Sequence, residues 1–256
     1  MLTISGNIAL ILFCIAASCA FFTILNSLWS PARRRVHNDV IGWQISVIGT
    51  IYAVIIGFML YAVWGNFQAA DANADSEANA AVDLFRISKG LPTAQRDLIQ
   101  SLSQNYVNAI ITEDWPAMRK GREGKTSNDI IEQLWSVTTN TETKNDAQQT
   151  DLNHAISILT ELTEHRRLRR LQSHSSLPGL LWAVLICGGI ITIVSCCLIG
   201  SENSALHLVL IIGLTLLVSL ILAAIAEIDG PFRGSVRISP YAFVQAQQSM
   251  NYMKKR

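Results

Sequence analysis

The strongest constraint on the fold is a set of four long stretches without any Asp, Glu, Lys or Arg. They cover Asn7–Trp29, Ile41–Gly65, Pro178–Gly200 and Ala205–Ala226, with lengths of 23, 25, 23 and 22 residues. A bilayer hydrocarbon core of about 30 Å is crossed by about 20 apolar residues in an α-helix, which rises about 1.5 Å per residue. Each stretch is long enough, so the sequence predicts an all-α integral membrane protein with four transmembrane helices.

The rest of the chain has the charge density of a soluble protein. The 20 Lys and Arg and the 19 Asp and Glu all lie in the other 163 of the 256 residues, roughly one residue in four. This distribution argues against a soluble enzyme and a secreted disulfide scaffold, and no region is basic enough to suggest a nucleic-acid partner. The predicted domains are transmembrane helices at 7–29, 41–65, 178–200 and 205–226, a soluble helical segment at 66–177 and a C-terminal tail at 227–256.

The cysteines give no sign of a disulfide framework or a metal site. All five lie inside the predicted spans, where cysteine behaves as a small apolar residue, and no CxxC pair or metal-ligand spacing occurs. No nucleophile–base set is visible in the spans either. We therefore expect no catalytic, cofactor-binding or metal-binding residues and no enzyme activity.

The soluble segment is predicted to be helical throughout. A first helix continues from the second span to Lys89, and a second runs from Thr93 to about Trp115-Pro116. A short third helix is predicted to be capped by Ser127. A fourth follows from about Gln149, with Leu152, Ile156, Leu159 and Leu162 on its inward face.

The tail begins with a helix-ending sequence, Asp229-Gly230-Pro231. We expect this turn to fold the tail back onto the soluble helices, with Asp229 or Glu227 pairing with a basic residue such as Arg86 or Arg166. The one strand signal is Ser235–Ser239, and an amphipathic helix is predicted after it.

The distribution of Lys and Arg favours a cytoplasmic soluble segment and cytoplasmic termini. On that side, six basic residues lie near span ends: Arg166, Arg167, Arg169, Arg170, Arg233 and Arg237. The loop between the first two spans has three, Arg33–Arg35. This compact basic run favours the opposite orientation, which stays open.

The second span has two distinct faces. Small residues recur at helical spacing on one face, where they allow a neighbouring backbone to approach closely; they are Gly42, Ser46, Gly49, Ala53 and Gly57. The opposite face carries Ile51, Ile55 and Phe58. Either the bulky face meets lipid around a tightly packed four-helix unit, or Ile51, Ile55 and Phe58 line a pore shared by several copies.

Acidic residues follow this span, and no Lys or Arg occurs between Asn66 and Phe85. Asp71, Asp75, Asn79 and Asp83 are spaced by four. In a ring of subunits, Asp71 and Asp75 would surround a vestibule with negative charge and concentrate cations. The alternative is a solvated helix face.

Ion-coupled transporters place ionisable groups at membrane depth. Here the spans contain no Asp, Glu, Lys or Arg, and their one histidine, His207, lies near a span end. Coupled transport is therefore disfavoured. A passive pore needs no charges, because an apolar constriction can gate by dewetting.

Several segments resemble the bacterial bestrophin-like membrane proteins. They include HNDVIGWQISVIGTIYAVIIGFMLYAVW, EANAAVDLFR, LPTAQRD, YVNAIITEDWPAM, HRRLRRLQSHSSLPGLLWAVL and DGPFRGSVRISPYAF. The resemblance runs from about Ile41 to Phe243, while the first span matches in hydropathy alone. It implies a distant similarity to bestrophins, which are pentameric ion channels with four spans per subunit and a helical cytosolic part. The acidic calcium-binding cluster of animal bestrophins has no counterpart here.

The resemblance and the residues together lead to one main hypothesis. It is a passive ion channel in a bacterial inner membrane, formed by a homo-oligomer, most simply a pentamer, with cation or weak selectivity. Its partners would be membrane lipid, further copies of the chain and a small permeant ion. The alternative is a non-conducting membrane scaffold or sensor whose soluble helices bind a partner protein, which an exposed apolar patch around Trp115 and Trp135 would favour.

Overall fold

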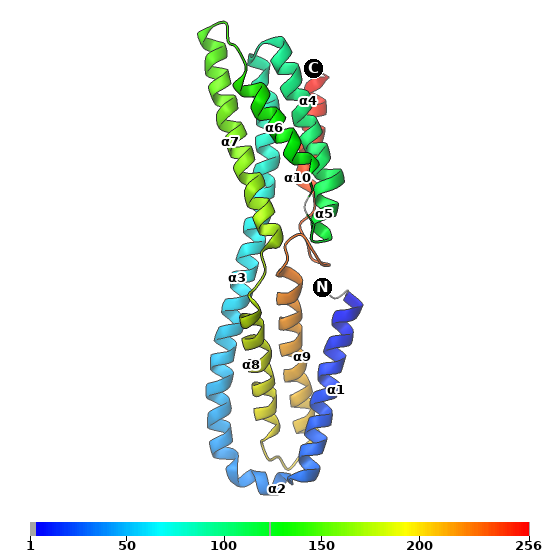
Figure 1. Ribbon diagram of the computed structural model, residues 1–256. Helices are drawn as coiled ribbons and strands as arrows, with labels where there is room; N and C mark the ends of the chain where they lie inside the picture. Colours follow the sequence, from blue (N-terminus) through cyan, green and yellow to red (C-terminus); the bar gives the residue numbers. More distant parts are fainter. Residues whose placement is uncertain (1–3, 123, 256) are drawn as a thin grey trace. The chain divides into compact units, whose positions relative to one another are not determined.

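The computed structural model describes residues 4–122 and 124–255, and within these ranges every regular element is a helix (Figure 1). The elements are α1 (Ile4–Leu28), α2 (Pro31–Arg34), α3 (Asn38–Ile87), α4 (Thr93–Ala109), α5 (Trp115–Arg119), α6 (Thr126–Thr139), α7 (Asp146–His174), α8 (Gly179–Cys197), α9 (Ser204–Ile228) and α10 (Tyr241–Lys254). Single 3₁₀ turns flank α3, and a π turn, Ile110–Asp114, joins α4 to α5.

The helices form two compact units. Unit 1 contains the residues up to Gly65 and Ser176–Asp229, and unit 2 contains Asn66–Ser175 and the residues from Gly230 onward. The tail after α9 thus belongs to the same unit as the segment between the second and third apolar helices. α3 is a single unbroken helix of 50 residues that contributes to both units.

Among residues 4–122 and 124–255, four helices are long and apolar enough to cross a membrane. They are α1, α8, α9 and the run 31–90 that contains α3, and each of the four charge-free stretches overlaps one of them. Their large apolar side chains are mostly exposed in the single chain. Such surfaces are incompatible with water and fit a lipid environment or contacts with further copies.

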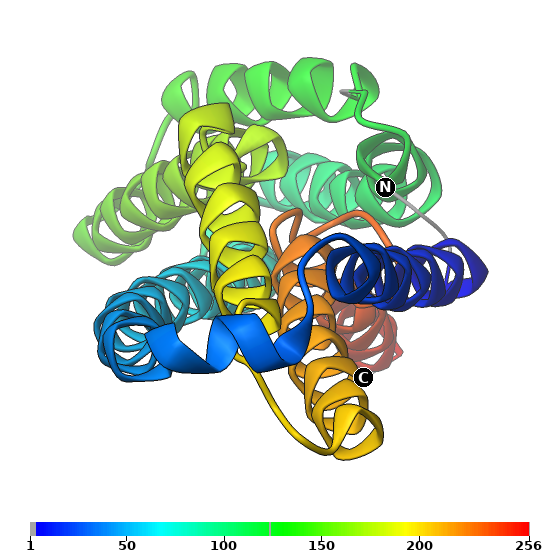
Figure 2. The ribbon, with the colours of Figure 1, turned by 90° about the horizontal axis from the view of Figure 1, so that it is seen from below.

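Two connections of unit 1 are tied together at one end. Figure 2 shows α2 lying between α1 and α3 at this end. Asn38 donates to the Gly200 carbonyl at 2.9 Å and accepts from the Gly200 amide at 2.8 Å, and Arg35 pairs with Glu202 at 2.6 Å. The Arg34 side chain is fully buried and donates to the Cys197 carbonyl at 2.6 Å and to the Asn26 amide oxygen. The α1–α3 connection and the α8–α9 connection therefore form one hydrogen-bonded layer.

α3 packs against α8 through a tyrosine in a glycine notch. The buried Tyr52 hydroxyl donates to the Leu185 carbonyl at 3.0 Å. A Cβ atom added at Gly188 would lie 2.6 Å from the Tyr52 ring, and one at Gly189 would lie 2.9 Å from its hydroxyl. Glycine is required at both positions because the ring occupies the space of a side chain.

Unit 2 has an apolar core shared by all its helices. Phe85 of α3, Tyr106 of α4, Leu134 of α6, Leu159 of α7 and Phe243 of α10 are each completely buried. Phe232 and Met250 of the tail lie in the same core, so the predicted folding back of the tail onto the soluble helices is confirmed.

Several local predictions for the soluble part are wrong. Ser235–Ser239 forms no strand; it is an irregular turn closed by a 2.8 Å bond from the Ile238 amide to the Pro231 carbonyl. Ser127 does not cap α6, which starts one residue earlier, and its hydroxyl is turned to the interior. The helix does not end at Trp115-Pro116 but continues through the π turn, because a proline is tolerated in the first turn of a new α-helix.

The predicted ion pairs of Glu227 and Asp229 with Arg86 or Arg166 would join the two units and stay a prediction. Asp229 accepts from the Leu177 amide at 2.7 Å, and Glu227 accepts from the Asn7 side chain. Arg86 pairs with Asp83 at 2.9 Å, one turn away on α3.

The glycine notch makes a prediction about stability. Gly188→Ala should lower the thermal unfolding midpoint of the detergent-purified protein, because overpacking at such a contact costs about 1–3 kcal/mol. Gly213→Ala on α9 is the matched control, since no atom lies within 4 Å of the position of its Cβ. An equal midpoint for the two variants would show that Tyr52 does not hold α3 on α8.

Candidate functional site

The part of α3 that lies in unit 1 uses only one face for contacts within the chain. Tyr52, Ile56 and Val63 are its buried residues, and at 100° per residue they share one face. The two faces singled out in the sequence lie on opposite flanks of it, each roughly 100° away. Neither flank contains a buried residue.

The bulky flank is largely exposed. Ile51 is 56% exposed, Phe58 is 66% exposed and Ile55 is half-buried. The small-residue flank is open as well, because nothing lies within 4 Å of a Cβ placed at Gly42, Gly49 or Gly57. Packing of the small-residue stripe, Gly42, Ser46, Gly49, Ala53 and Gly57, against a neighbouring helix therefore stays a prediction.

The acidic residues of α3 separate into an exposed set and one buried member. Asp71, Asp75 and Asp83 lie on the exposed side of the helix. Glu77 points the other way and is completely buried, in a stripe that also contains Ala70, Ala74, Ala81 and Leu84. The structure therefore keeps Asp71 and Asp75 together on the surface and uses Glu77 for a different purpose.

Glu77 forms a two-bond ion pair with Arg169 of α7. The guanidinium donates to the carboxylate from Nε at 2.7 Å and from Nη2 at 3.1 Å, and both side chains are essentially inaccessible to solvent. The Tyr106 hydroxyl donates to the same carboxylate. A planar guanidinium matches a carboxylate in this parallel arrangement, which is the strongest form of such a pair.

Asp114 extends the pair into a network. Arg169 Nη2 lies 3.3 Å from Asp114 Oδ2, and the Ser127 hydroxyl donates to this oxygen at 2.7 Å. Ser127 in turn accepts from Arg166 at 3.1 Å. We call Glu77, Tyr106, Asp114, Ser127, Arg166 and Arg169 the buried polar cluster; it joins α3, α4, the π turn, α6 and α7.

Aromatic rings enclose the guanidinium of Arg169. Its Cζ atom lies 5.8 Å from the centre of the Trp115 ring and 6.0 Å from that of Phe243, and its Nη1 lies 3.3 Å from the sulfur of Met118. The Trp115 indole donates to the Ile238 carbonyl of the tail at 3.2 Å. The tail therefore contributes Phe243 and the Ile238 carbonyl to the surroundings of the cluster.

The surroundings of Arg169 and Tyr106 raise the pKa values of both side chains. Burial acts to lower the pKa of Arg169, but the Glu77 carboxylate overcomes it, and the pKa of Arg169 is raised. Burial, reinforced by the Glu77 carboxylate, raises the pKa of Tyr106 well above its usual range. Tyr106 therefore stays a neutral donor, and Arg169 stays a cation.

The π turn explains how Tyr106 and Asp114 reach one side of the helix. In a regular α-helix, eight residues advance two turns and overshoot by about 80°. The π turn at Ile110–Asp114 accommodates an extra residue in one wider turn and reduces this overshoot. Asp114 is thus brought to Arg169, next to the Tyr106–Glu77 bond.

Sequence reasoning missed this cluster, although a signal was present. The inward leucines predicted for α7 include Leu159 and Leu162, and the same stripe continues to Arg166 and Arg169, which are both buried. Two arginines on an apolar stripe indicate buried counter-charges elsewhere in the chain. Trp115, which was considered as an exposed docking residue, is 3% exposed and belongs to this core.

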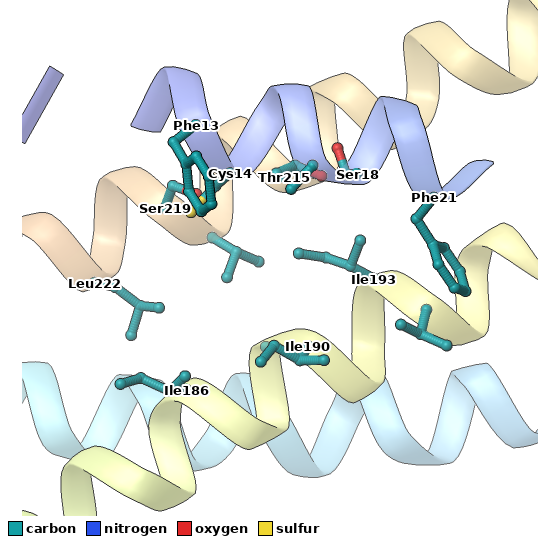
Figure 3. Close-up of a pocket in the computed structure, with 14 residues that line it drawn as sticks. Phe13, Cys14, Ser18, Phe21, Ile186, Ile190, Ile193, Thr215, Ser219 and Leu222 are labelled. Atoms are coloured by element: carbon teal, nitrogen blue, oxygen red, sulfur yellow. The ribbon is translucent and has the colours of Figure 1, made fainter. Parts of the chain in front are cut away.

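Unit 1 contains a separate feature, an apolar cavity of about 340 Å³ between α1, α8 and α9. Figure 3 shows Phe13 and Phe21 of α1 and Ile190 of α8 around it. The Thr215 hydroxyl of α9 also lines it, is buried and has no hydrogen-bond partner. A second cavity of about 490 Å³ adjoins it and ends near Glu227.

The arrangement contains no recognisable catalytic or metal centre in the part of the chain that the structure describes. No group of three or more His, Cys, Asp and Glu side chains there could hold a metal ion. The carboxylates of the buried polar cluster bind arginines, a tyrosine and a serine and are closed to solvent. The cluster is therefore suited to fixing helices in place.

The cluster makes a prediction about stability. Glu77→Gln should strongly destabilise the protein, since removing one partner of a buried ion pair costs about 3–5 kcal/mol. Asp83→Asn breaks the exposed pair with Arg86 on the same helix and should cost at most about 1 kcal/mol. Thermal unfolding midpoints and the yield of folded protein measure both effects.

A triple variant keeps this test decisive if Glu77→Gln does not fold. Glu77→Leu combined with Arg169→Met and Asp114→Asn removes the three charges of the two ion pairs and should recover much of the lost stability, because neither carboxylate is left as an unpaired buried charge. If the triple variant is less stable than Glu77→Gln, the ion pair is not what the single substitution disrupts.

The fold is found in solved structures of bacterial membrane proteins. A variant of a bestrophin homologue from Klebsiella pneumoniae is similar with a TM-score of 0.74 at 12% identity, over 96% of this chain and 99% of that chain. Another structure of the homologue gives a TM-score of 0.72 at 12% identity, with the same coverage. A variant described only as a membrane protein gives 0.73 at 11% identity, over 96% of this chain and 99% of the other.

Sequence comparison identifies the family. No curated protein matches the chain. The model of the bestrophin-like domain matches residues 12–243, which is nearly the whole chain and includes most of α1, the other three apolar helices and the buried polar cluster. The chain is therefore a member of the bestrophin-like family.

Proposed function

We propose that the chain is one subunit of a passive ion channel, a closed ring of identical copies in a bacterial inner membrane. The observation that carries the proposal is the family, together with an α3 whose two flanking faces contain no buried residue in the single chain. Bestrophins are ion channels. A subunit in a ring needs a face toward the axis and faces toward its neighbours, and α3 offers both.

The proposed topology has four membrane spans, α1, the first half of α3, α8 and α9. The hydrogen bonds between Asn38 and Gly200 support it, since they hold the two short connections at one end of unit 1. In this arrangement the soluble segment and both ends of the chain lie on the opposite side of the membrane. The six arginines near the span ends on that side favour the cytoplasm.

The proposed pore face is Ile51, Ile55 and Phe58, and the small-residue face packs against the neighbouring copy. An apolar ring conducts only when it is wide enough to stay wet, so it can serve as a gate. Five copies are the number expected from the family. Because no Asp, Glu, Lys, Arg or His lies between Ile41 and Gly65, the path offers no charged group for proton-coupled transport.

The acidic residues set the proposed selectivity. At 100° per residue along an unbroken α3, Asp71 and Asp75 fall on the side of the small residues, more than a quarter turn from Ile51, Ile55 and Phe58. If Ile51, Ile55 and Phe58 face the axis, the carboxylates act across about one helix diameter of 10 Å, close to the screening length at physiological salt. We therefore propose weak cation preference.

A polar substitution at the proposed pore face should raise the ion flux. Ile51→Thr, reconstituted in liposomes, is expected to increase ion efflux severalfold, because a hydroxyl keeps the constriction wet. Ile191→Thr on α8 is the matched control, an isoleucine that is 50% exposed where Ile51 is 56% exposed. Equal flux for both variants contradicts the assignment of Ile51 to the pore.

Charge removal tests the vestibule. Asp71→Asn with Asp75→Asn should shift the reversal potential in asymmetric KCl toward the anion value by a few millivolts, and Asp97→Asn on α4 should leave it unchanged. A large shift would place the acidic face on the axis instead of Ile51, Ile55 and Phe58. An unchanged potential would make Asp71 and Asp75 a solvated surface.

The alternative function, a non-conducting scaffold or sensor, remains distinguishable from a channel. Trp115 is buried, and the Trp135 indole is half-buried and donates to the Thr163 hydroxyl at 3.0 Å, so these residues do not form the exposed patch that would favour a docking role. Liposomes that contain the purified protein and show no ion flux above protein-free liposomes would support the scaffold.

A further inference from the structure

The two cavities of unit 1 are sections of one cleft between α1, α8 and α9. They have volumes of about 340 and 490 Å³ and share lining residues from all three helices, Cys14, Ile186, Ser219 and Leu222. We call the section of about 340 Å³ the inner section. Figure 3 shows it, with apolar side chains of α1 and α8 turned toward it.

The cleft is closed at the end of unit 1 that contains the short connections. Phe22, Cys197 and Ile211 form a buried apolar cluster there and are 3% exposed or less. On α9 the lining of the cleft stops at Thr215, which lies roughly 16 Å of helix from the first residue, Ser204. The three helices therefore pack closely at one end and leave the cleft open toward the other.

The open part has the length of one membrane leaflet. On α9 the lining covers residues 215–227, which span about 18 Å of helix. Half of a hydrocarbon core of about 30 Å is about 15 Å, the depth that one acyl chain occupies. A hydrocarbon chain that enters at the outer end of the cleft would therefore reach its closed end near the centre of the bilayer.

The walls of the inner section favour hydrocarbon over water. Ten of its 14 lining residues are Ala, Gly, Val, Leu, Ile or Phe, and none is charged. The Ser18 hydroxyl donates to the Ile15 carbonyl at 2.9 Å, and the Thr215 hydroxyl is closed to solvent. Packed protein interiors do not leave a space of this size empty, and apolar walls do not hold water well.

The length of the cleft favours a lipid over a helix of a second copy. A helix that crosses the bilayer beside unit 1 would need a surface along the whole hydrocarbon core of about 30 Å. The cleft instead ends at the cluster of Phe22, Cys197 and Ile211. An acyl chain also begins at one face of the bilayer and ends at its centre, so it matches the cleft in both direction and length.

We propose that this cleft binds one acyl chain of a membrane phospholipid from the leaflet on the side of the soluble segment. The chain lies along α1, α8 and α9, with its ester end near Leu10 and its methyl end near Thr215. The site rests on the proposed membrane insertion of these helices and not on conduction.

A photoactivatable lipid tests the position of the chain. Phosphatidylcholine with a diazirine at the end of one acyl chain is added to the detergent-purified full chain, and excess lipid is removed. Native mass spectrometry counts the retained lipid, and peptide mapping after irradiation locates the label. We expect one retained lipid per chain and severalfold more label on Leu222, which lines the cleft, than on Leu217, which is 57% exposed outside it. Equal label on the two leucines overturns the site.

A matched pair of substitutions on α1 tests the cleft itself. Ala17 lines it, while the preceding residue, Ala16, is exposed and does not. Ala17→Phe should abolish the retained lipid, and Ala16→Phe should keep it. Ser219→Leu fills the cleft from α9 and serves if Ala17→Phe does not fold. Equal lipid counts in the filled variants and in Ala16→Phe contradict the proposal.

The mass of the oligomer and the ion flux separate this proposal from its alternatives. If Ala17→Phe dissociates an oligomer that Ala16→Phe leaves intact, a second copy occupies the cleft and the lipid site is wrong. Protein that conducts ions in liposomes without retaining a lipid in detergent overturns the lipid site alone. Protein that retains the lipid and does not conduct overturns the channel alone.

Discussion

The buried ion pair between Glu77 and Arg169 is the interaction on which the rest of unit 2 depends. Each charge is completely buried, and either one alone would cost several kcal/mol. α3 and α7 are also the helices through which the chain enters and leaves the segment between the second and third apolar helices. The guanidinium of Arg169 also contacts Asp114, Trp115 and Phe243. The same charge therefore organises the π turn and the tail.

The sequence predicted the parts of the fold that depend on composition and period. A run of more than 20 residues without charge has few alternatives to an apolar helix, which is why α1, α8 and α9 could be located to within a few residues. The ion pair could not be located in this way, because Glu77 and Arg169 are 92 residues apart. Several arginines precede α8. Only a position on the same face of α7 as Leu159 and Leu162 distinguishes the buried arginines from the exposed ones.

The same limits apply to the candidate pore. Spacing alone placed Ile51 and Gly49 on different faces of α3, and among the described residues neither face contains a buried side chain. Tyr52, between them, was not predicted as the packing residue, because its role depends on the glycine notch at Gly188 on a helix more than 100 residues away. A single sequence contains no information about which distant glycine receives which ring.

The two units follow the physics of two solvents. Unit 2 buries Phe85, Phe232 and Phe243 completely, as a protein in water must. Unit 1 leaves Phe58 and Leu180 at 66% and 76% exposure, which carries no penalty in hydrocarbon. In lipid there is no hydrophobic drive to close the cleft between α1, α8 and α9, because a lipid chain in the space is as favourable as a side chain. The hydrophobic effect therefore explains both features. It closes the aromatic core of unit 2 in water, and it does not act on the cleft of unit 1 in lipid.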